Sequence, residues 1–183
     1  IRICLVGSEM CIRDRFWGVQ LGGMVAVLVD AGAADRLEAV HAVLPEAHVI
    51  AEAAPLLRHT PAGPVPTANP DPDAVAVIQF SSGSTGDPRG VTLTHRSLLA
   101  NIEAIIAGLG GVEADVFVSW LPLFHDMGLI GYHLLPVVLT ADQALMSPRH
   151  FLKKPGDWLA AMSRLGSTAV SYTHLRAHET DTD

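Results

Sequence analysis

A short apolar run, followed at once by a loop rich in glycine and hydroxyl side chains, restricts the possible folds of this chain more than any other feature. The run Ala74–Ile78 has the composition of a buried strand, and Gln79–Gly90 then reads QFSSGSTGDPRG. Glycine permits positive φ and close approach, so backbone N–H groups in such a loop can turn toward one point. Hydroxyl groups and a guanidinium add further donors for phosphate oxygens. The pattern predicts a phosphate-binding loop formed by Ser81, Ser82, Gly83, Ser84, Thr85, Gly86, Arg89 and Gly90.

Two better-known loop motifs do not fit these residues. A Walker A loop ends in Gly-Lys-Ser/Thr and opens a helix, whereas here Gly90 leads into Val91–Leu93, a β-branched stretch that predicts a second strand. No Gly-x-Ser-x-Gly elbow of a serine hydrolase can be drawn through the loop. A polar surface turn between two strands is the remaining alternative to phosphate binding.

The two ends of the chain are related at the level of DNA. One choice of codons for Val170–Glu179, read on its complementary strand, translates to Leu5–Asp14 without a mismatch. An inverted repeat flanking an insert would give this relation, and the nucleotide string resembles a transposase adapter used in sequencing libraries. We therefore expect residues 1–15 and 170–183 to be translated adapter, and 16–169 to be part of one domain of a longer protein.

Composition excludes some classes of partner. Acidic residues outnumber basic ones, 19 to 12, and no cluster of Lys and Arg occurs, so a nucleic-acid partner is not expected. No apolar stretch reaches the length of a membrane span. Both cysteines, Cys4 and Cys11, lie in the presumed adapter and give no information on redox compartment. We expect a cytoplasmic protein.

Helical and strand patterns alternate along the insert. Predicted strands are Met24–Val29, His48–Ile50, Ala74–Ile78, Val91–Leu93, Asp115–Ser119 and Ala144–Met146. Predicted helices are one that ends at Gly22, Ala33–Leu44, His95–Ala107 with Thr94 as its cap, Met127–Leu139 and Pro155–Leu165. Five prolines make Thr60–Pro72 an extended connector. The alternation predicts an α/β fold whose largely parallel sheet carries helices on both faces.

A second informative block, Ser119–Gly131, reads SWLPLFHDMGLIG, in which a strand ends and a loop leads into a helix. Side chains at the carboxyl edge of a parallel sheet are where α/β proteins bind ligands, so Phe124 and His125 could border a tunnel for an apolar chain. Alternatively, Asp126 caps the following helix and His125 is an ordinary hydrogen-bonded loop residue. Adjacent side chains are expected to point apart, so no catalytic dyad is predicted.

Together these residues resemble the adenylate-forming ligases, which include acyl-CoA synthetases, luciferases and fatty acyl-AMP ligases. Ile78–Arg89 is similar to the phosphate-loop signature of that family, and His95–Asn101 to the helix that follows it. Ser119–Leu129, with its His-Asp-Met-Gly sequence, is most similar to the fatty acyl-AMP ligase branch, as are Phe151 and Trp158 further on. Arg89 departs from the lysine more usual in the family, which keeps the charge but changes the contact geometry.

The resemblance implies an N-terminal-domain fragment of an enzyme that uses ATP and Mg²⁺ to convert a fatty acid to its acyl-adenylate. An acyl carrier protein, or alternatively coenzyme A, would then accept the acyl group. His125 would lie near the acyl carboxylate, with Met127, Gly128 and Leu129 toward the acyl tunnel.

The same resemblance implies that the catalytic lysine and most Mg²⁺ ligands lie outside this chain. No catalytic residue or metal ligand is therefore assigned within it, and the fragment is expected to be inactive alone. An acyl-CoA synthetase fragment and a non-catalytic module that binds nucleotide or acyl groups remain alternatives.

Overall fold

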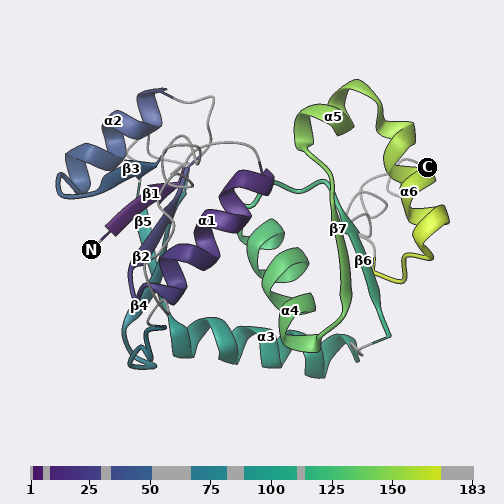
Figure 1. The fold of residues 1–183 in the computed structure, drawn as a ribbon, viewed down its shortest axis with the longest axis horizontal. Coiled ribbons are helices and arrows are strands. Elements are labelled where there is room, and N and C mark those ends of the chain that lie inside the picture. The colour runs from purple at the N-terminus through teal and green to yellow at the C-terminus, as the bar shows by residue number, and fades with distance from the viewer. Residues whose placement is uncertain are drawn as a thin grey trace, which may run out of the picture. The chain divides into compact units, whose positions relative to one another are not determined.

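The computed structural model describes residues 2–5, 9–29, 34–50, 67–81, 89–110 and 114–169 (Figure 1). The chain divides into two compact units, Ile1–Asn101 and Ile102–Asp183. The division falls within helix α3 (His95–Leu109), so this helix begins in the first unit and ends in the second.

The first unit contains a five-stranded sheet in the order β3-β1-β2-β4-β5. Its strands are β1 (Arg2–Leu5), β2 (Val25–Leu28), β3 (His48–Ile50), β4 (Val75–Ser81) and β5 (Arg89–Thr94). β3, β1, β2 and β4 are parallel, while β5 pairs antiparallel with β4. The predicted α/β class and largely parallel sheet are confirmed.

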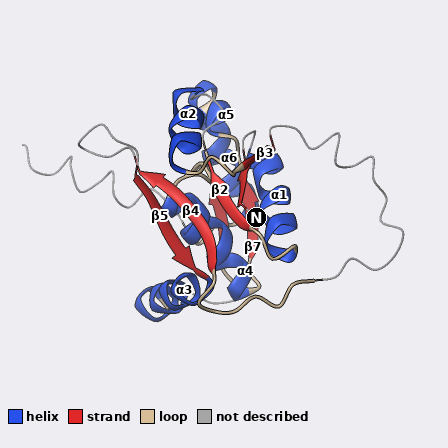
Figure 2. Cartoon of the chain, turned by 90° about the vertical axis from the view of Figure 1, so that its left-hand side faces the viewer, coloured by secondary structure: helices blue, strands red, loops and turns tan. Residues whose placement is uncertain are grey.

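Different helices cover the two faces of this sheet, α1 (Glu9–Leu21) and α2 (Ala34–Val43) (Figures 1 and 2). Val27 and Ile78 pack with Val40 of α2 in a buried apolar cluster. Side chains alternate along a strand, so the other side chains of β2 face α1. Burial of both faces explains why β2 and the first part of β4, Val75–Ile78, are apolar rather than alternating.

The N-terminal residues, which the sequence analysis excluded from the fold, form part of this unit. β1 lies between β3 and β2, and Ile12 of α1 is fully buried. The run Arg2–Leu5 is mostly apolar, which suits a strand with neighbours on both edges. The structure thus includes in the first unit residues that the sequence analysis set aside. Their origin as translated adapter stays a prediction.

The remaining elements of the first unit agree with the sequence analysis to within a residue or two, except that β4 ends three residues later than the expected strand Ala74–Ile78. The helix expected to end at Gly22 ends at Leu21, and the strand expected over Val91–Leu93 is the core of β5. Of the expected connector, residues 67–72 contain no helix or strand, and the earlier part lies outside the described residues.

The second unit is built around a two-stranded parallel sheet, β6 (Val116–Ser119) and β7 (Asp142–Leu145). A π-helix, η2 (Met127–Leu134), and α4 (Leu135–Leu139) connect the strands, and α5 (Pro148–Lys153) and α6 (Pro155–Leu165) follow. α4 and α6 lie on either side of the two strands (Figure 1). Ala169 makes a parallel bridge to Phe117 on the free side of β6.

The second unit differs from its predicted elements in three respects. β7 begins two residues earlier than the expected strand Ala144–Met146. The helix expected over Met127–Leu139 has π geometry in its first part, where Leu135 N–H donates to the Ile130 carbonyl five residues back. α5 was not predicted, since a helix this short leaves little periodic signal.

Among the residues that the structure describes, no helix combines the length and the apolar character needed to cross a membrane.

Candidate functional site

The predicted phosphate loop joins the two strands of the β4–β5 hairpin. Ser81, the last residue of β4, pairs with Arg89, the first residue of β5, so the two ends of the loop meet. The predicted site residues Ser82, Gly83, Ser84, Thr85 and Gly86 lie outside the described residues. The convergence of their amide groups on a phosphate therefore stays a prediction, while the strand before the loop and the strand after it are confirmed.

Arg89 and Gly90, the last two predicted residues of the loop, belong to β5. Arg89 is exposed, so its guanidinium is accessible to a ligand. Gly90 pairs with Phe80 across the hairpin, and a Cβ there would lie 3.2 Å from Ile78 Cγ2 and 3.4 Å from the Phe80 ring. Close packing within the hairpin, rather than a turn conformation, therefore favours glycine at this position.

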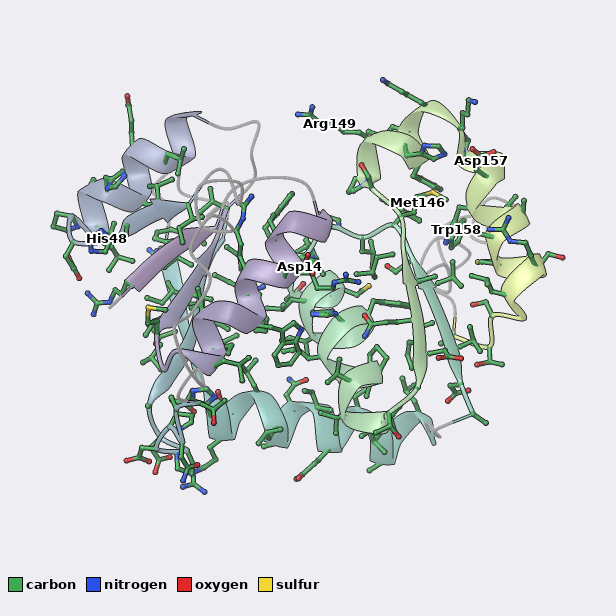
Figure 3. All side chains as sticks on the ribbon, in the orientation of Figure 1. Asp14, His48, Met146, Arg149, Asp157 and Trp158 are labelled. Atoms are coloured by element: carbon green, nitrogen blue, oxygen red, sulfur yellow. The ribbon has the colours of Figure 1, made fainter. Side chains whose placement is uncertain are left out.

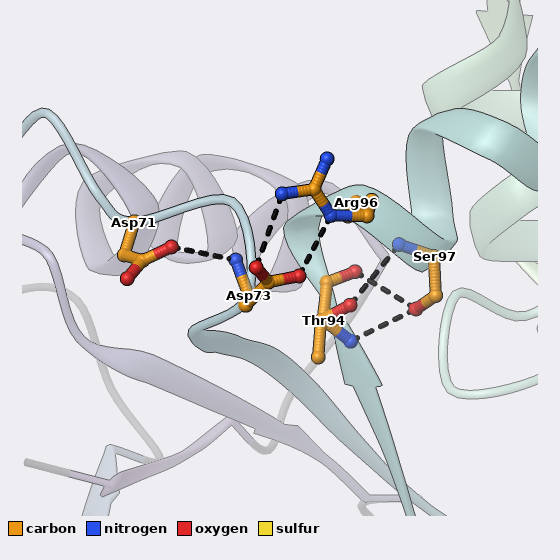
Figure 4. A network of polar contacts seen from close by, with 5 residues as sticks. All are labelled: Asp71, Asp73, Thr94, Arg96 and Ser97. Atoms are coloured by element: carbon orange, nitrogen blue, oxygen red, sulfur yellow. Dashed lines mark hydrogen bonds and ion pairs between the residues drawn. The ribbon is translucent and has the colours of Figure 1, made fainter.

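The opposite end of the hairpin is held by an ion pair (Figure 4). Arg96 donates to both carboxylate oxygens of Asp73, over 2.7 Å from Nε and 3.0 Å from a terminal nitrogen. The hydrogen bond from Arg96 lowers the pKa of the Asp73 carboxyl below its ordinary value. The same bond, aided by the charge of Asp71, raises the pKa of Arg96. Both groups thus stay charged at neutral pH, and they connect the start of α3 to the segment that enters β4.

Thr94 caps α3 as the sequence predicted. Ser97 N–H donates to Thr94 Oγ1 over 3.1 Å, and Thr94 N–H donates to Ser97 Oγ over 2.9 Å (Figure 4). This reciprocal pair satisfies amide groups at the helix start. It holds the junction where β5 ends and α3 begins.

The second predicted block folds compactly between β6 and η2. Leu121 N–H donates to Ser119 Oγ over 3.0 Å, and His125 N–H donates to the Pro122 carbonyl over 3.1 Å. A Cβ on Gly128 would lie 2.1 Å from the Pro122 carbonyl oxygen, far inside any permitted contact. Glycine is thus required at position 128, because the start of η2 touches the backbone of this loop.

His125 and Asp126 do not point apart, and that expectation was wrong. His125 Nδ1 lies 2.7 Å from Asp126 Oδ1, and the same oxygen accepts the Met127 N–H over 2.7 Å. Asp126 therefore caps η2, as the alternative interpretation had it, and contacts the imidazole as well. Both side chains are largely exposed, 60% for His125 and 70% for Asp126.

The four predicted substrate-binding residues differ in accessibility. His125 and Met127 are exposed, whereas Gly128 and Leu129 are buried, Leu129 to 1% exposure. Leu129 N–H also donates to the His125 carbonyl over 2.9 Å. The structure thus brings His125 and Met127 to the surface and places the other two against the loop that carries them. Their contact with an acyl chain stays a prediction.

Aromatic side chains that the sequence analysis did not assign to the site support the beginning of the block. Trp120 stacks on Phe151 of α5, with ring centroids 4.0 Å apart and planes 2° from parallel. Trp158 lies on α6 (Figure 3). Phe151 meets it edge to face, and Trp158 Nε1–H donates to the Val118 carbonyl over 3.2 Å. The two tryptophans and the phenylalanine thus attach β6 and its loop to α5 and α6.

No group of three or more His, Cys, Asp or Glu side chains suited to a metal ion occurs within the described part of the chain. A cavity of about 240 Å³ lies in the second unit, lined by residues of α3, β6 and α4 with Thr168 and Ala169. A second, of about 400 Å³, is lined by Arg2, Val25, Glu46 and His48 in the first unit. Neither is lined by a predicted site residue.

The first unit contains a largely parallel sheet with a loop between β4 and β5, and the second unit contains a strand-loop-helix block. These features define an α/β protein with two candidate ligand-binding loops. The family model for AMP-binding enzyme matches residues 19–174. The chain belongs to the AMP-binding enzyme family, which confirms the resemblance inferred from its motifs.

Individual relatives are ligases of fatty acids. The chain is 44% identical over 93 residues to the medium-chain-fatty-acid–[acyl-carrier-protein] ligase TtuA of Teredinibacter turnerae, covering 51% of this chain and 14% of that protein. It is 41% identical over 95 residues to the long-chain-fatty-acid–AMP ligase FadD32 of Mycolicibacterium smegmatis. This match covers 52% of this chain and 15% of that protein.

Among solved structures, the fatty acyl-adenylate ligases from E. coli and L. pneumophila include a chain similar to this one, with a TM-score of 0.74 and 29% identity. The match covers 92% of this chain and 35% of that one. The chain therefore spans about a third of that structure and about a seventh of the two relatives.

Proposed function

We propose that this chain is part of an ATP-dependent ligase that activates a fatty acid as its acyl-adenylate and passes the acyl group to the thiol of an acyl carrier protein. The observation that carries the proposal is the β4–β5 hairpin, in which pairing of Ser81 with Arg89 closes a Ser/Thr/Gly-rich segment beside a parallel sheet. Membership of the AMP-binding enzyme family and the names of the relatives support it.

In the first step, a carboxylate oxygen of the fatty acid attacks the α-phosphorus of ATP, and pyrophosphate leaves. Backbone amides and hydroxyls of the loop, together with Arg89, would hold the β- and γ-phosphates and stabilise the charge that develops there. Arg89 is suited to this because it is exposed at the loop's end and presents several donors in one plane. Mg²⁺ would neutralise phosphate charge, held mostly by residues outside this chain.

In the second step, the thiol sulfur attacks the acyl carbon, and AMP leaves. His125 and Met127 are exposed residues of the second block, on either side of the helix cap Asp126, so we assign them to the acyl side of the site. Gly128 and Leu129 would form the buried wall of the acyl side of the site, since both are buried against the loop.

The names of TtuA and FadD32 favour a ligase that loads a carrier protein or forms an acyl-AMP over one that uses coenzyme A. The test is to offer the full-length protein a phosphopantetheinylated carrier protein and coenzyme A in parallel, with a labelled fatty acid. Labelled carrier protein supports the proposal. Label found only on coenzyme A identifies the alternative, an acyl-CoA synthetase.

The activity itself is tested by fatty acid-dependent exchange of pyrophosphate into ATP, measured on the full-length protein. Arg89→Gln should lower the exchange rate about 10- to 100-fold, because a charged donor to the pyrophosphate is lost. Arg164→Gln, an exposed arginine of α6, is the matched control and should leave the rate unchanged.

Three outcomes separate the alternatives. If the two arginine variants exchange at the same rate, Arg89 does not contact phosphate. Binding of ATP without any exchange by the wild-type full-length protein would indicate the non-catalytic module. The 183-residue chain by itself is expected to show no exchange.

A further inference from the structure

Three basic side chains lie together on α5 and directly after it. Arg149, Lys153 and Lys154 are all exposed, and none of them forms an ion pair with another residue that the structure describes. Arg149 extends away from the ribbon of α5 (Figure 3). The one acidic residue in the sequence of α5 and α6, Asp157, is hydrogen-bonded to His150 over 2.7 Å instead. The positive charge of this surface is therefore not neutralised within the described part of the chain.

The stability of α5 does not explain these charges. Arg149 lies in the first turn, where the helix dipole disfavours a cation, although Lys153 lies at the favourable end. Lys153 follows Arg149 by four residues on the same side of the helix, and like charges at this spacing repel. The sequence analysis found no basic cluster, since the winding of α5 is what brings the two residues together. A binding role accounts for charges that cost stability.

An exposed apolar side chain belongs to the same surface. Leu152, three residues after Arg149 and next to Lys153, is 78% exposed. An apolar contact surrounded by charged groups is typical of a protein interface, whereas a free anion gains nothing from a leucine. Bilayers are bound by helices with a long apolar face, but α5 has six residues, and the net charge of −7 disfavours an anionic membrane. The surface therefore fits a protein partner whose facing side chains are acidic.

The opposite side of α5 contacts the second block. Phe151 stacks on Trp120, the residue directly after β6 and the first of the loop that leads to His125. β6 and β7 are parallel, and α5 begins three residues after β7 ends, so the helix lies at the carboxyl ends of both strands. The basic surface is thus separated from the loop assigned to the acyl side by the width of one helix, about 10 Å.

We propose that Arg149, Leu152, Lys153 and Lys154 form a docking surface for an acidic face of the acyl carrier protein that accepts the acyl group. The inference rests on the proposed function, in which the acceptor thiol is carried by a protein. A carrier protein bound to α5 would hold its phosphopantetheine arm beside the loop that contains His125. The four residues bind the partner and touch neither the acyl group nor ATP.

The test measures transfer of a labelled acyl group by the full-length protein to a phosphopantetheinylated carrier protein and, in parallel, to free pantetheine, an uncharged thiol with the same reactive end. Lys153→Glu should raise the KM for the carrier protein about 10-fold relative to the KM for pantetheine, because an acidic partner then meets a like charge. The effect should shrink at about 1 M NaCl, where charges are screened. Leu152→Ala should raise the same ratio less and without this dependence on salt.

Arg164→Glu is the matched control, since it makes the same change of charge at an exposed position in the last turn of α6. It should change the ratio of the two KM values less than about twofold. An effect equal to that of Lys153→Glu would show that only the overall charge matters, and would overturn the docking surface. An unchanged ratio in Lys153→Glu would overturn it as well.

Further outcomes distinguish this inference from the proposed function. If Lys153→Glu raises both KM values equally, α5 supports the site rather than a partner, and the inference fails alone. If the wild type loads pantetheine or coenzyme A but no carrier protein, the proposed acceptor is wrong, and the docking surface fails with it. Sedimentation of the wild type with vesicles of phosphatidylcholine and phosphatidylglycerol, abolished by Lys153→Glu, would assign the surface to a bilayer and overturn the inference.

Discussion

The base of the β4–β5 hairpin and the loop before η2 are both held by specific contacts, but these contacts lie in different environments. At the hairpin base, Arg96 and Asp73 are 62% and 68% exposed, and their pairing is purely polar. Before η2, Gly128 is packed against the backbone of Pro122, and Trp158 is buried where it donates to Val118.

The two environments predict different responses to substitution. Exposed ion pairs gain little net free energy, because water already solvates both partners and salt screens them. When a buried backbone contact is disrupted, water cannot replace the lost interaction, and close-packed neighbours cannot easily move. The loop before η2 should therefore be the sensitive region, and the hairpin base the tolerant one.

Gly128→Ala should have the largest effect on stability. The added Cβ would lie 2.1 Å from the Pro122 oxygen and 2.8 Å from its carbonyl carbon, so the loop or the helix must move. We expect a loss of about 2–3 kcal/mol in the free energy of unfolding, measured by urea denaturation of the chain.

Gly131→Ala, in the same helix, is the matched control. A Cβ at that position meets only Met127 Cγ, at 3.9 Å, so the stability should stay constant or rise by up to about 1 kcal/mol. Equal urea midpoints for the two alanine variants would show that the contact with Pro122 does not constrain the loop.

Trp158→Phe should have an intermediate effect. Phenylalanine can keep the edge-to-face contact with Phe151 but cannot donate to the Val118 carbonyl, which is left without this donor inside the unit. The expected loss is about 1–3 kcal/mol in the free energy of unfolding. Leu159→Ala, at the next and exposed position, should cost less than about 0.5 kcal/mol. A Trp158→Phe variant as stable as Leu159→Ala would contradict the importance of this hydrogen bond.

Much of this fold could be predicted from local sequence. The helix Pro155–Leu165 was predicted with its observed bounds, because Pro155 suits a first helical turn and Gly166 takes the left-handed conformation that ends a helix. Thr94 was correctly identified as a cap from its position before a periodic apolar pattern. These features depend on a few neighbouring residues, so a single sequence contains them.

Features that depend on contact between segments could not be predicted. Nothing in the periodicity of Met127–Leu139 indicates that Gly128 must admit the Pro122 carbonyl. The His125–Asp126 contact depends on side-chain rotamers that spacing does not determine. β1 was missed for another reason, since the coding relation between the chain ends led us to set aside residues that form a strand.

The smallest effect is expected at the hairpin base, where it should depend on pH. Arg96 lowers the pKa of Asp73 below its ordinary value of 3.8, so the folded state favours the ionised carboxyl. The stability from this pair is therefore fully present above the ordinary pKa and is lost as the pH falls through the lower, folded value. Asp73→Asn should reduce the urea midpoint slightly at neutral pH, and the difference from the wild type should close in acid.

Salt gives an independent check on the same pair. The midpoint difference between wild type and Asp73→Asn should also shrink at about 1 M NaCl, where charges are screened within a few ångströms. Asp142→Asn, at an exposed aspartate of β7 with no ion pair among the described residues, should show no such dependence on salt. A difference that persists unchanged in acid and in high salt would mean that the Asp73 side chain does not act through its charge pairing with Arg96. The hairpin base would then not be held by an exposed ion pair, and the contrast between the two regions would disappear.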